Sequence, residues 1–368
     1  MLQGWRRAAI AAIVGIVAIG SAQAADQEIK AVPGEYVLTI NPDFLSLSTD
    51  ELSDVLGIEV VRKVSEASHA YLVRTSMLED TEYVLARLGD HRAVQIIEPN
   101  FIYETVNLPN DPGLDRLWGL INDGRSGTKG VDVGAQEAWK IHTGAKNVIV
   151  AVIDTGVDYT IPDLAPNMWV NAAEANGTAG VDDDGNGFVD DLYGWDFANN
   201  DNDPKDDHSH GSHVSGTIGA KGNDNQGVVG VNWDVQIMAL KFIKAQGGGT
   251  LEGAIGAIDY AVKMGANVLN NSWGGGGYSQ QLYDAIDRTK KANRLFVAAA
   301  GNSSSDNDKK PTYPASYQID NIISVAAIDA RGNKASFSCY GKKSVHIAAP
   351  GVQIFSTVPG GFSAMSGT

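Results

Sequence analysis

The sequence has 368 residues, of which 43% are hydrophobic and 20% charged, as is typical of a folded protein with one large and one smaller domain. The formal net charge of −16 argues against a nucleic-acid or anionic-membrane partner. Cys339 is the single cysteine, so no disulfide can form within the chain, and we expect stability to come from core packing and bound ions.

The first 24 residues have the pattern of an export signal. Arg6 and Arg7 precede an apolar run over residues 8–20, and Ala22-Gln23-Ala24 matches a cleavage site. A buried core helix is the alternative, but the positive charge, the length of the apolar run and the small residues of the cleavage site occur together, as in a signal peptide. The run is too short for a membrane span. We therefore predict a protein that is secreted, outside the cell or into the periplasm, with no membrane span after signal cleavage.

Residues 25–107 are predicted to form a small α+β domain. Apolar alternation indicates strands, and a 3.6-residue spacing behind Thr81 as the cap indicates one helix. Strands are expected at 35–40 and 70–75, a strand followed by an exposed tail within 93–104, and the helix at 81–90. Two prolines and two asparagines within residues 105–114 then predict a linker.

Residues 108–368 are predicted to form a larger α/β domain. Continuous apolar runs of strand length, typical of strands buried on both faces, occur at 147–154, 235–242, 267–273, 294–302 and 321–329. Amphipathic helices are expected between them, at 251–265 and 279–293. This alternation predicts a three-layer, doubly wound, mainly parallel sheet, in which functional residues follow the carboxyl ends of the strands.

Polar residues at such ends are the candidates for chemistry. Asp154 ends the first buried run, where it could cap a turn or orient a histidine. The stretch 206–220 carries three histidines, and a metal site is one interpretation of that cluster. The stretch continues as a helix of small residues, however, with His210 at its start, His213 on its first turn as a packing residue, and His208 in the preceding loop. Asn302 follows another strand, where it could serve a turn or donate to an oxyanion.

Three motifs in this order, "VAVIDTGVD", "HGSHVSG" and "AAAGN", resemble the subtilisin family of serine proteases. The resemblance runs from about residue 33 to the end and implies an inhibitory, chaperone-like propeptide over 25–107. It implies that Asp154 is the orienting carboxylate, His210 the general base and Asn302 the oxyanion-hole donor. Ser212 departs from the family pattern, which usually has Thr there.

The resemblance also bears on the last residues, "GGFSAMSGT". The nucleophile motif of the family reads G-T-S-M-A, and this sequence ends on Gly367-Thr368. Ser363 and Ser366 precede that pair and do not match the nucleophile. We therefore expect this sequence to be a fragment that stops one residue before the catalytic serine and before the buried helix that follows it. A catalytically dead homologue that binds peptide or calcium on the same scaffold is the alternative.

The substrate-binding residues implied by the resemblance come from two strand ends. The edge that pairs with an extended peptide would be Ser272, Trp273 and Gly274. The opposite wall would be formed by Ala299, Ala300 and Gly301, with Thr312 or Tyr313 near the base. Because these segments carry no charge, we expect an apolar or broad preference for the residue before the cut. Gly275–Gly277 is also readable as a plain turn.

Calcium is the expected cofactor, at two sites. In "DDDGNGFVDD", oxygen-bearing side chains have the spacing of a calcium loop: Asp182, Asp184, Asn186 and Asp190. Tyr193 replaces the bidentate glutamate of an EF-hand, so an EF-hand is not expected, and a solvated acidic loop is the alternative. By resemblance alone, a second site would use Asp111, Asp163 and Asp224 with the carbonyls of Gly222, Gln226 and Val228.

Together these features predict a secreted, calcium-stabilised serine endopeptidase precursor. Its partners would be polypeptide substrates and its own propeptide, which acts as an intramolecular inhibitor until cleavage near residues 104–110. We expect a monomer.

Overall fold

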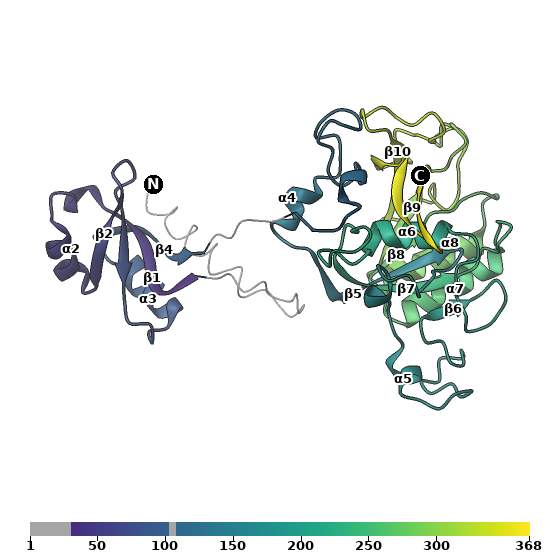
Figure 1. Cartoon of the computed structure of the whole chain (residues 1–368), viewed down its shortest axis with the longest axis horizontal. Coiled ribbons are helices and arrows are strands. Elements are labelled where there is room, and N and C mark those ends of the chain that lie inside the picture. The colour runs from purple at the N-terminus through teal and green to yellow at the C-terminus, as the bar shows by residue number, and fades with distance from the viewer. Residues whose placement is uncertain (1–30, 103–107) are drawn as a thin grey trace. The chain divides into compact units, whose positions relative to one another are not determined.

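The computed structural model describes residues 31–102 and 108–368. The predicted signal peptide, and part of the predicted propeptide cleavage region, lie outside these residues. The chain divides into two compact units, Met1–Val106 and Asn107–Thr368 (Figure 1). Among the helices in the described ranges, none combines the length and apolarity that crossing a bilayer requires.

The first unit is a four-stranded antiparallel sheet with two helices. Its strand order is β2-β3-β1-β4, and its elements are β1 (Ala31–Ile40), α2 (Thr49–Leu56), β2 (Glu59–Ser65), β3 (Ala70–Arg74), α3 (Thr81–Gly89) and β4 (Val94–Phe101). Inward side chains of β1 and β3, such as Leu38 and Val73, pack with Leu52 of α2 and Leu88 of α3 in one buried cluster. The predicted strands and helix of this region are confirmed, and the structure adds α2 and β2.

Local sequence explains how its helices begin. The hydroxyl of Ser48 accepts from the backbone N–H of Glu51, and the Glu51 carboxylate accepts from the N–H of Ser48, which forms a capping box before α2. Gly57 ends α2 with a φ of 66°. The expected cap of α3 at Thr81 is wrong: the carboxylate of Asp80 accepts from the N–H of Tyr83, and Thr81 is already helical.

The second unit is built on a seven-stranded sheet in the order β11-β10-β9-β8-β5-β7-β6. All of its pairings are parallel. The strands are β5 (Gly144–Asp154), β6 (Gly194–Asp196), β7 (Asp234–Lys241), β8 (Val268–Asn271), β9 (Leu295–Ala299), β10 (Ile322–Ile328) and β11 (Ile347–Pro350). The mainly parallel α/β fold is thus confirmed.

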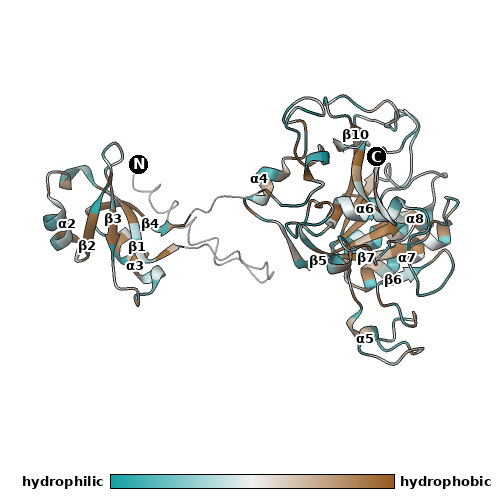
Figure 2. Cartoon of the chain, viewed as in Figure 1, coloured by the Kyte–Doolittle hydropathy of each residue, from teal (hydrophilic) through white to brown (hydrophobic). Residues whose placement is uncertain are grey.

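Helix α6 (His210–Gly219) packs on one face of this sheet, and α7 (Leu251–Lys263) and α8 (Gln280–Lys291) pack on the other. The short helices α4 (Ala135–Trp139) and α5 (Ala172–Ala175) lie to the side of the sheet, and α5 stands in a loop that extends away from it (Figure 1). Along β5, Ala151 and Ile153 belong to the core cluster with α7 and α8, whereas Val150 and Val152 belong to the cluster with α6. This alternation makes β5 apolar on both faces and produces three layers, and the sheet strands are correspondingly brown in Figure 2.

Small residues allow α6 to pack closely. A Cβ on Gly216 would lie 2.2 Å from Oγ1 of Thr357, on the hairpin of β12 (Ile354–Val358) and β13 (Gly361–Met365). A Cβ on Gly211 would lie 2.0 Å from the carbonyl oxygen of Gly156, just after β5. The first turn of α6 is therefore pressed against the end of the central strand.

Candidate active site

Asp154 and His210 meet at the carboxyl edge of the sheet. Asp154 is the last residue of β5 and is fully buried, and His210 is the first residue of α6. The Nδ1–H of His210 donates to Oδ1 of Asp154 over 2.7 Å, across 56 residues of sequence. The backbone N–H of Thr155 donates to the same oxygen over 2.7 Å. Nε2 is consequently the ring nitrogen that His210 can offer to another group.

The carboxylate raises the pKa of His210. The hydrogen bond with Asp154 is the largest cause, burial of the ring opposes it, and the charges of Asp154 and Asp206 add to the rise. Because Nδ1–H of His210 is held by the Asp154 carboxylate, the ring can take up a proton at Nε2, and the carboxylate then stabilises the imidazolium that results.

The other two histidines of the cluster have different surroundings. The Nε2–H of His213 donates to the carbonyl of Ile354 over 2.8 Å, and burial lowers the pKa of His213. His208 lies in the loop before α6, with its ring centre 6.4 Å from that of His210. Within the described ranges, no group of three or more metal-ligating side chains includes a histidine. The metal interpretation of the cluster is therefore not supported, and the packing role predicted for His213 is confirmed.

Asn302 lies in the loop after β9 and contacts the end of the chain. Its Oδ1 accepts from the backbone N–H and the hydroxyl of Thr368, over 3.1 and 3.0 Å. The N–H of Gly301 donates to the same hydroxyl over 3.2 Å. With Oδ1 engaged, the NH2 group of Asn302 is the donor that this side chain can offer to a substrate. Ser366 accepts from the N–H of Gln353, and Ser363 lies within β13.

The two predicted walls of the substrate cleft converge on Thr312. Its Cγ2 lies 3.4 Å from where a Cβ would stand on Gly274 and 3.2 Å from where one would stand on Gly301. The N–H of Gly275 donates to the carbonyl of Tyr313 over 3.0 Å, which ties the same segments together. Ser272 accepts from the side-chain amide of Asn270. The backbones of Gly274 and Gly301 thus both lie close to the Thr312 methyl group.

The structure does not bring every predicted wall residue to this surface. Ala300 is fully buried against Cys339, and both of its backbone groups are engaged, its N–H with Val325 and its carbonyl with the side chain of Asn307. Trp273 turns its ring inward, 4.9 Å from that of Phe242. The half-buried ring of Trp273 thus packs partly into the core, and Ala300 supports the wall from behind.

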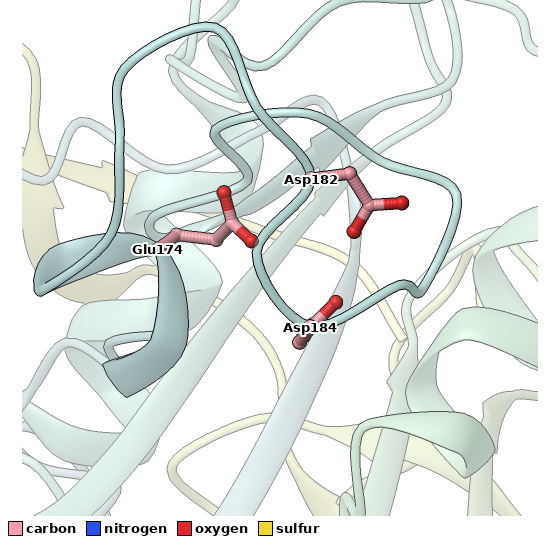
Figure 3. Close-up of side chains that lie close together, drawn as sticks. All are labelled: Glu174, Asp182 and Asp184. Carbon is pink, nitrogen blue, oxygen red and sulfur yellow. The ribbon is translucent and has the colours of Figure 1, made fainter.

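The acidic loop 182–191 brings two of its predicted ligands together. Glu174, Asp182 and Asp184 each offer a carboxylate oxygen within 4.8 Å of the others (Figure 3). Glu174 comes from α5 and was not predicted. Asn186 instead turns its NH2 group to Asp184 and to the buried Asp191, while its Oδ1 accepts from the N–H of Phe188.

Asp190 also lies outside this cluster, because both of its oxygens accept from the N–H of Gly180, over 3.0 and 2.8 Å. The backbone N–H groups of Gly187 and Asn186 lower the pKa of Asp182, which keeps it ionised. Three ionised or ionisable carboxylates in one loop make an oxygen donor set of the type that calcium prefers.

The second predicted group is more deeply buried. Asp111 and Asp163 are 4% and 3% exposed, and burial, followed by the neighbouring charge of Asp224, raises the pKa of both. Oδ1 of Asp111 is buried without a hydrogen-bond partner. Among the described residues, only Glu174, Asp182 and Asp184 bring three such ligand atoms within 4.8 Å, so this second group is more widely spaced. An orphaned carboxylate oxygen on Asp111, with the charged Asp224 beside it, nevertheless fits a bound cation.

Comparison with known proteins identifies the family. Residues 145–368 match the Subtilase family, Peptidase_S8. The chain belongs to the subtilase family.

Several relatives of this subtilase are proteases by name. The thermophilic serine proteinase of Bacillus sp. (strain AK1) is 34% identical over 295 residues, which cover 78% of this chain and 63% of the relative. Subtilisin-like protease 1 of Plasmodium berghei (strain Anka) is 37% identical over 237 residues, or 60% of this chain and 40% of the relative. The subtilase chain therefore spans less than two thirds of the length of these relatives.

Solved structures share the fold. A cold-adapted subtilisin-like serine proteinase superposes with a TM-score of 0.53 and 29% identity, covering 68% of this subtilase and 78% of that chain. A protease of Pseudoalteromonas arctica PAMC 21717 superposes with a TM-score of 0.56, at 24% identity, over 71% and 82% of the two chains. The three-layer architecture predicted for this subtilase is thereby confirmed.

Proposed function

We propose that this subtilase is a secreted, calcium-stabilised serine endopeptidase that hydrolyses peptide bonds by acyl transfer. The observation that carries the proposal is the 2.7 Å hydrogen bond between His210 and the buried Asp154 at the carboxyl edge of the sheet. A paired imidazole with a free Nε2, in a family whose named relatives are proteases, fits a general base better than a structural histidine.

In this mechanism Asp154 holds the His210 ring with Nδ1–H toward the carboxylate, so that Nε2 faces the nucleophile. We assign the nucleophile to a serine that follows Thr368. Support comes from Thr368 itself, whose hydroxyl and N–H contact Gly301 and Asn302. The next residue would thus start beside the NH2 group of Asn302, which would donate to the oxyanion as the serine attacks the carbonyl carbon.

The proton leaves the serine hydroxyl for Nε2 of His210, and the imidazolium then protonates the leaving amine as the peptide bond breaks. Water repeats the sequence on the acyl-enzyme and regenerates the serine. Extended substrates would add a strand along Ser272–Gly274, with the P1 side chain toward Thr312.

Two calcium ions are part of the proposal. Glu174, Asp182 and Asp184 would hold one, and Asp111, Asp163 and Asp224 the other. Calcium supplies positive charge that stabilises these clustered carboxylates in the folded state, and the orphaned oxygen of Asp111 supports the second site. The unit before residue 107 would act as the propeptide and intramolecular inhibitor, the first 24 residues as the export signal, and the mature enzyme as a monomer.

A fluorophosphonate probe tests the activity directly, because it reacts only with an activated serine. We expect the protein expressed from the gene, read through codon 368, to be labelled at the residue after Thr368. His210→Ala should abolish labelling, while His208→Ala, a matched histidine in the preceding loop, should retain it. Labelling that survives His210→Ala would refute the base assignment. A stop codon, or any residue other than serine, after Thr368 would instead favour a non-catalytic scaffold protein.

A further inference from the structure

A second buried acid lies next to the Asp154–His210 pair and takes no part in the mechanism above. Asp206 is in the loop before α6 and is 6% exposed. Its oxygens accept four hydrogen bonds, each of 2.9 Å: Oδ1 from the hydroxyl of Thr155 and the N–H groups of His208 and Ser209, and Oδ2 from the N–H of Ser212. One carboxylate therefore gathers the end of β5 and the start of α6.

Thr155 links the two halves of the pair. It follows Asp154 directly, and its hydroxyl donates to Asp206 while accepting from the N–H of Gly211, over 2.9 Å. Gly211 in turn follows His210. The residues that come directly after the carboxylate and after the imidazole are thus joined through one hydroxyl, which Asp206 orients.

The backbone before His210 needs such a restraint. Ser209, the N-cap of α6, has a φ of 89° and makes no side-chain capping bond. Residues other than glycine rarely adopt this left-handed conformation, and they persist in it only where surrounding contacts enforce it. The N–H of Ser209 donates to Asp206, so this carboxylate supplies the contact that stabilises the turn into His210.

We propose that Asp206 is a positioning residue that sets the distance and orientation between Asp154 and His210. Lys241 supports the same segment from β7: it is 1% exposed, and its ammonium donates to the carbonyl of Thr155 over 2.7 Å and to Asp207 over 2.6 Å. The inference rests on the proposed function only in its kinetic test, because the geometry of the pair is measurable without turnover.

A positioning carboxylate also has an electrostatic signature that a purely structural residue lacks. The titratable groups that face His210 are Asp154 on β5, Asp206 and His208 in the preceding loop, and His213 on α6. The negative charge of Asp206 contributes to the raised pKa of His210. Removing this charge should therefore lower the pKa of His210 as well as loosen its position.

The first test uses the 368-residue chain and NMR. We expect Asp206→Asn to move the ring titration of His210 to lower pH and to speed exchange of its Nδ1–H proton. Asp196→Asn is the matched control, because Asp196, the last residue of β6, is 1% exposed and likewise accepts from backbone and amide N–H groups, of Ala198 and Asn199. The proposal would be overturned if the pKa of His210 were the same in the wild type and in Asp206→Asn. It would also be overturned if Asp206→Asn and Asp196→Asn changed that pKa equally.

The second test is kinetic and uses the complete enzyme. Asp206→Asn should lower kcat by about 10²-fold with little change in KM, since misplacement of a catalytic group by about 1 Å has effects of that size. Thr155→Val, which removes the hydroxyl, should mimic the loss, and Thr155→Ser should restore most of it. These Thr155 variants decide the matter if Asp206→Asn does not fold. An inactive wild type would refute the proposed function but leave the NMR result standing; equal kcat in Thr155→Val and Thr155→Ser would refute the role of Asp206.

Discussion

Replacing Thr312 with glycine should change which residue the enzyme prefers before the cut. The uncharged walls of the cleft predict an apolar or broad preference, and Thr312 adds a size limit. Its methyl group lies 3.4 and 3.2 Å from where a Cβ would stand on Gly274 and Gly301, so a side-chain carbon on either glycine would already be at or inside the usual contact distance of about 3.5–4.0 Å. The methyl group therefore leaves little space beside the two glycines, and we expect small P1 residues such as alanine to be preferred.

The magnitude follows from the space that glycine would free. Thr312→Gly removes the Cβ, the methyl group and the hydroxyl, which corresponds to about two or three methylene groups of a larger P1 side chain. At about 0.8 kcal/mol per buried methylene, leucine or phenylalanine should gain about 1.6–2.4 kcal/mol relative to alanine. This equals a change of about 15- to 60-fold in the ratio of kcat/KM values.

The assay compares peptide p-nitroanilides that differ only in alanine, leucine or phenylalanine at P1. Thr312→Ser is the matched control, because it removes the methyl group and keeps the hydroxyl that donates to Asn307 over 3.1 Å; it should give an intermediate ratio. A wild-type enzyme that already prefers phenylalanine to alanine, or a ratio that Thr312→Gly leaves unchanged, would refute the reasoning.

Three further predictions concern the base, the calcium sites and the packing of α6. The pKa of His210 is raised, and the protonated ring cannot accept the serine proton. As the pH is lowered, kcat/KM should therefore fall with an apparent pKa above the ordinary histidine value of about 6.5; an apparent pKa below that value would contradict the pairing with Asp154. EGTA should lower the midpoint of thermal unfolding, since each calcium site adds about 2.7 kcal/mol to the free energy of unfolding at free calcium 100 times its Kd. Calorimetry should show a smaller effect of EGTA on Glu174→Gln and on Asp111→Asn than on the wild type. An equal effect would show that these two residues do not bind calcium. Gly211→Ala should destabilise the unit by about 1–3 kcal/mol in urea unfolding despite the higher helix propensity of alanine, because the new Cβ would lie 2.0 Å from a backbone oxygen; an unchanged midpoint would contradict that packing.

Much of the fold was predictable because its central strands are buried on both faces. Such strands are continuous apolar runs, and the prediction found β5, β7, β8, β9 and β10 within a few residues. It missed β6 and β11, which have three and four residues, and α2, whose single pair of buried leucines is too short to establish a helical period. Pairing with longer neighbours defines β6 and β11, whereas α2 is marked by its capping box and by Gly57.

The candidate site divides in the same way. Asp154 and His210 could be predicted as site residues because each stands at a recognisable boundary: Asp154 ends a strand and His210 begins a helix. Glu174 was not, because it reaches the acidic loop only through the position of α5. The spacing of Asn186 could not show which way its amide turns, and that of Ala300 could not show that its backbone groups are already paired. These are properties of packing between distant segments.

The contrast between Asp154 and Asp206 shows how two buried acids at one site can differ in role. Asp154 faces the imidazole, and its Oδ2 is buried without a hydrogen-bond partner, so its charge acts chiefly on His210. Asp206 has each oxygen engaged by backbone or hydroxyl donors, so its charge acts chiefly on the chain. An acid that must stabilise a transient imidazolium gains from having few competing donors, whereas an acid that must hold a strained turn gains from having many. Exchanging the environments of the two should therefore weaken both functions.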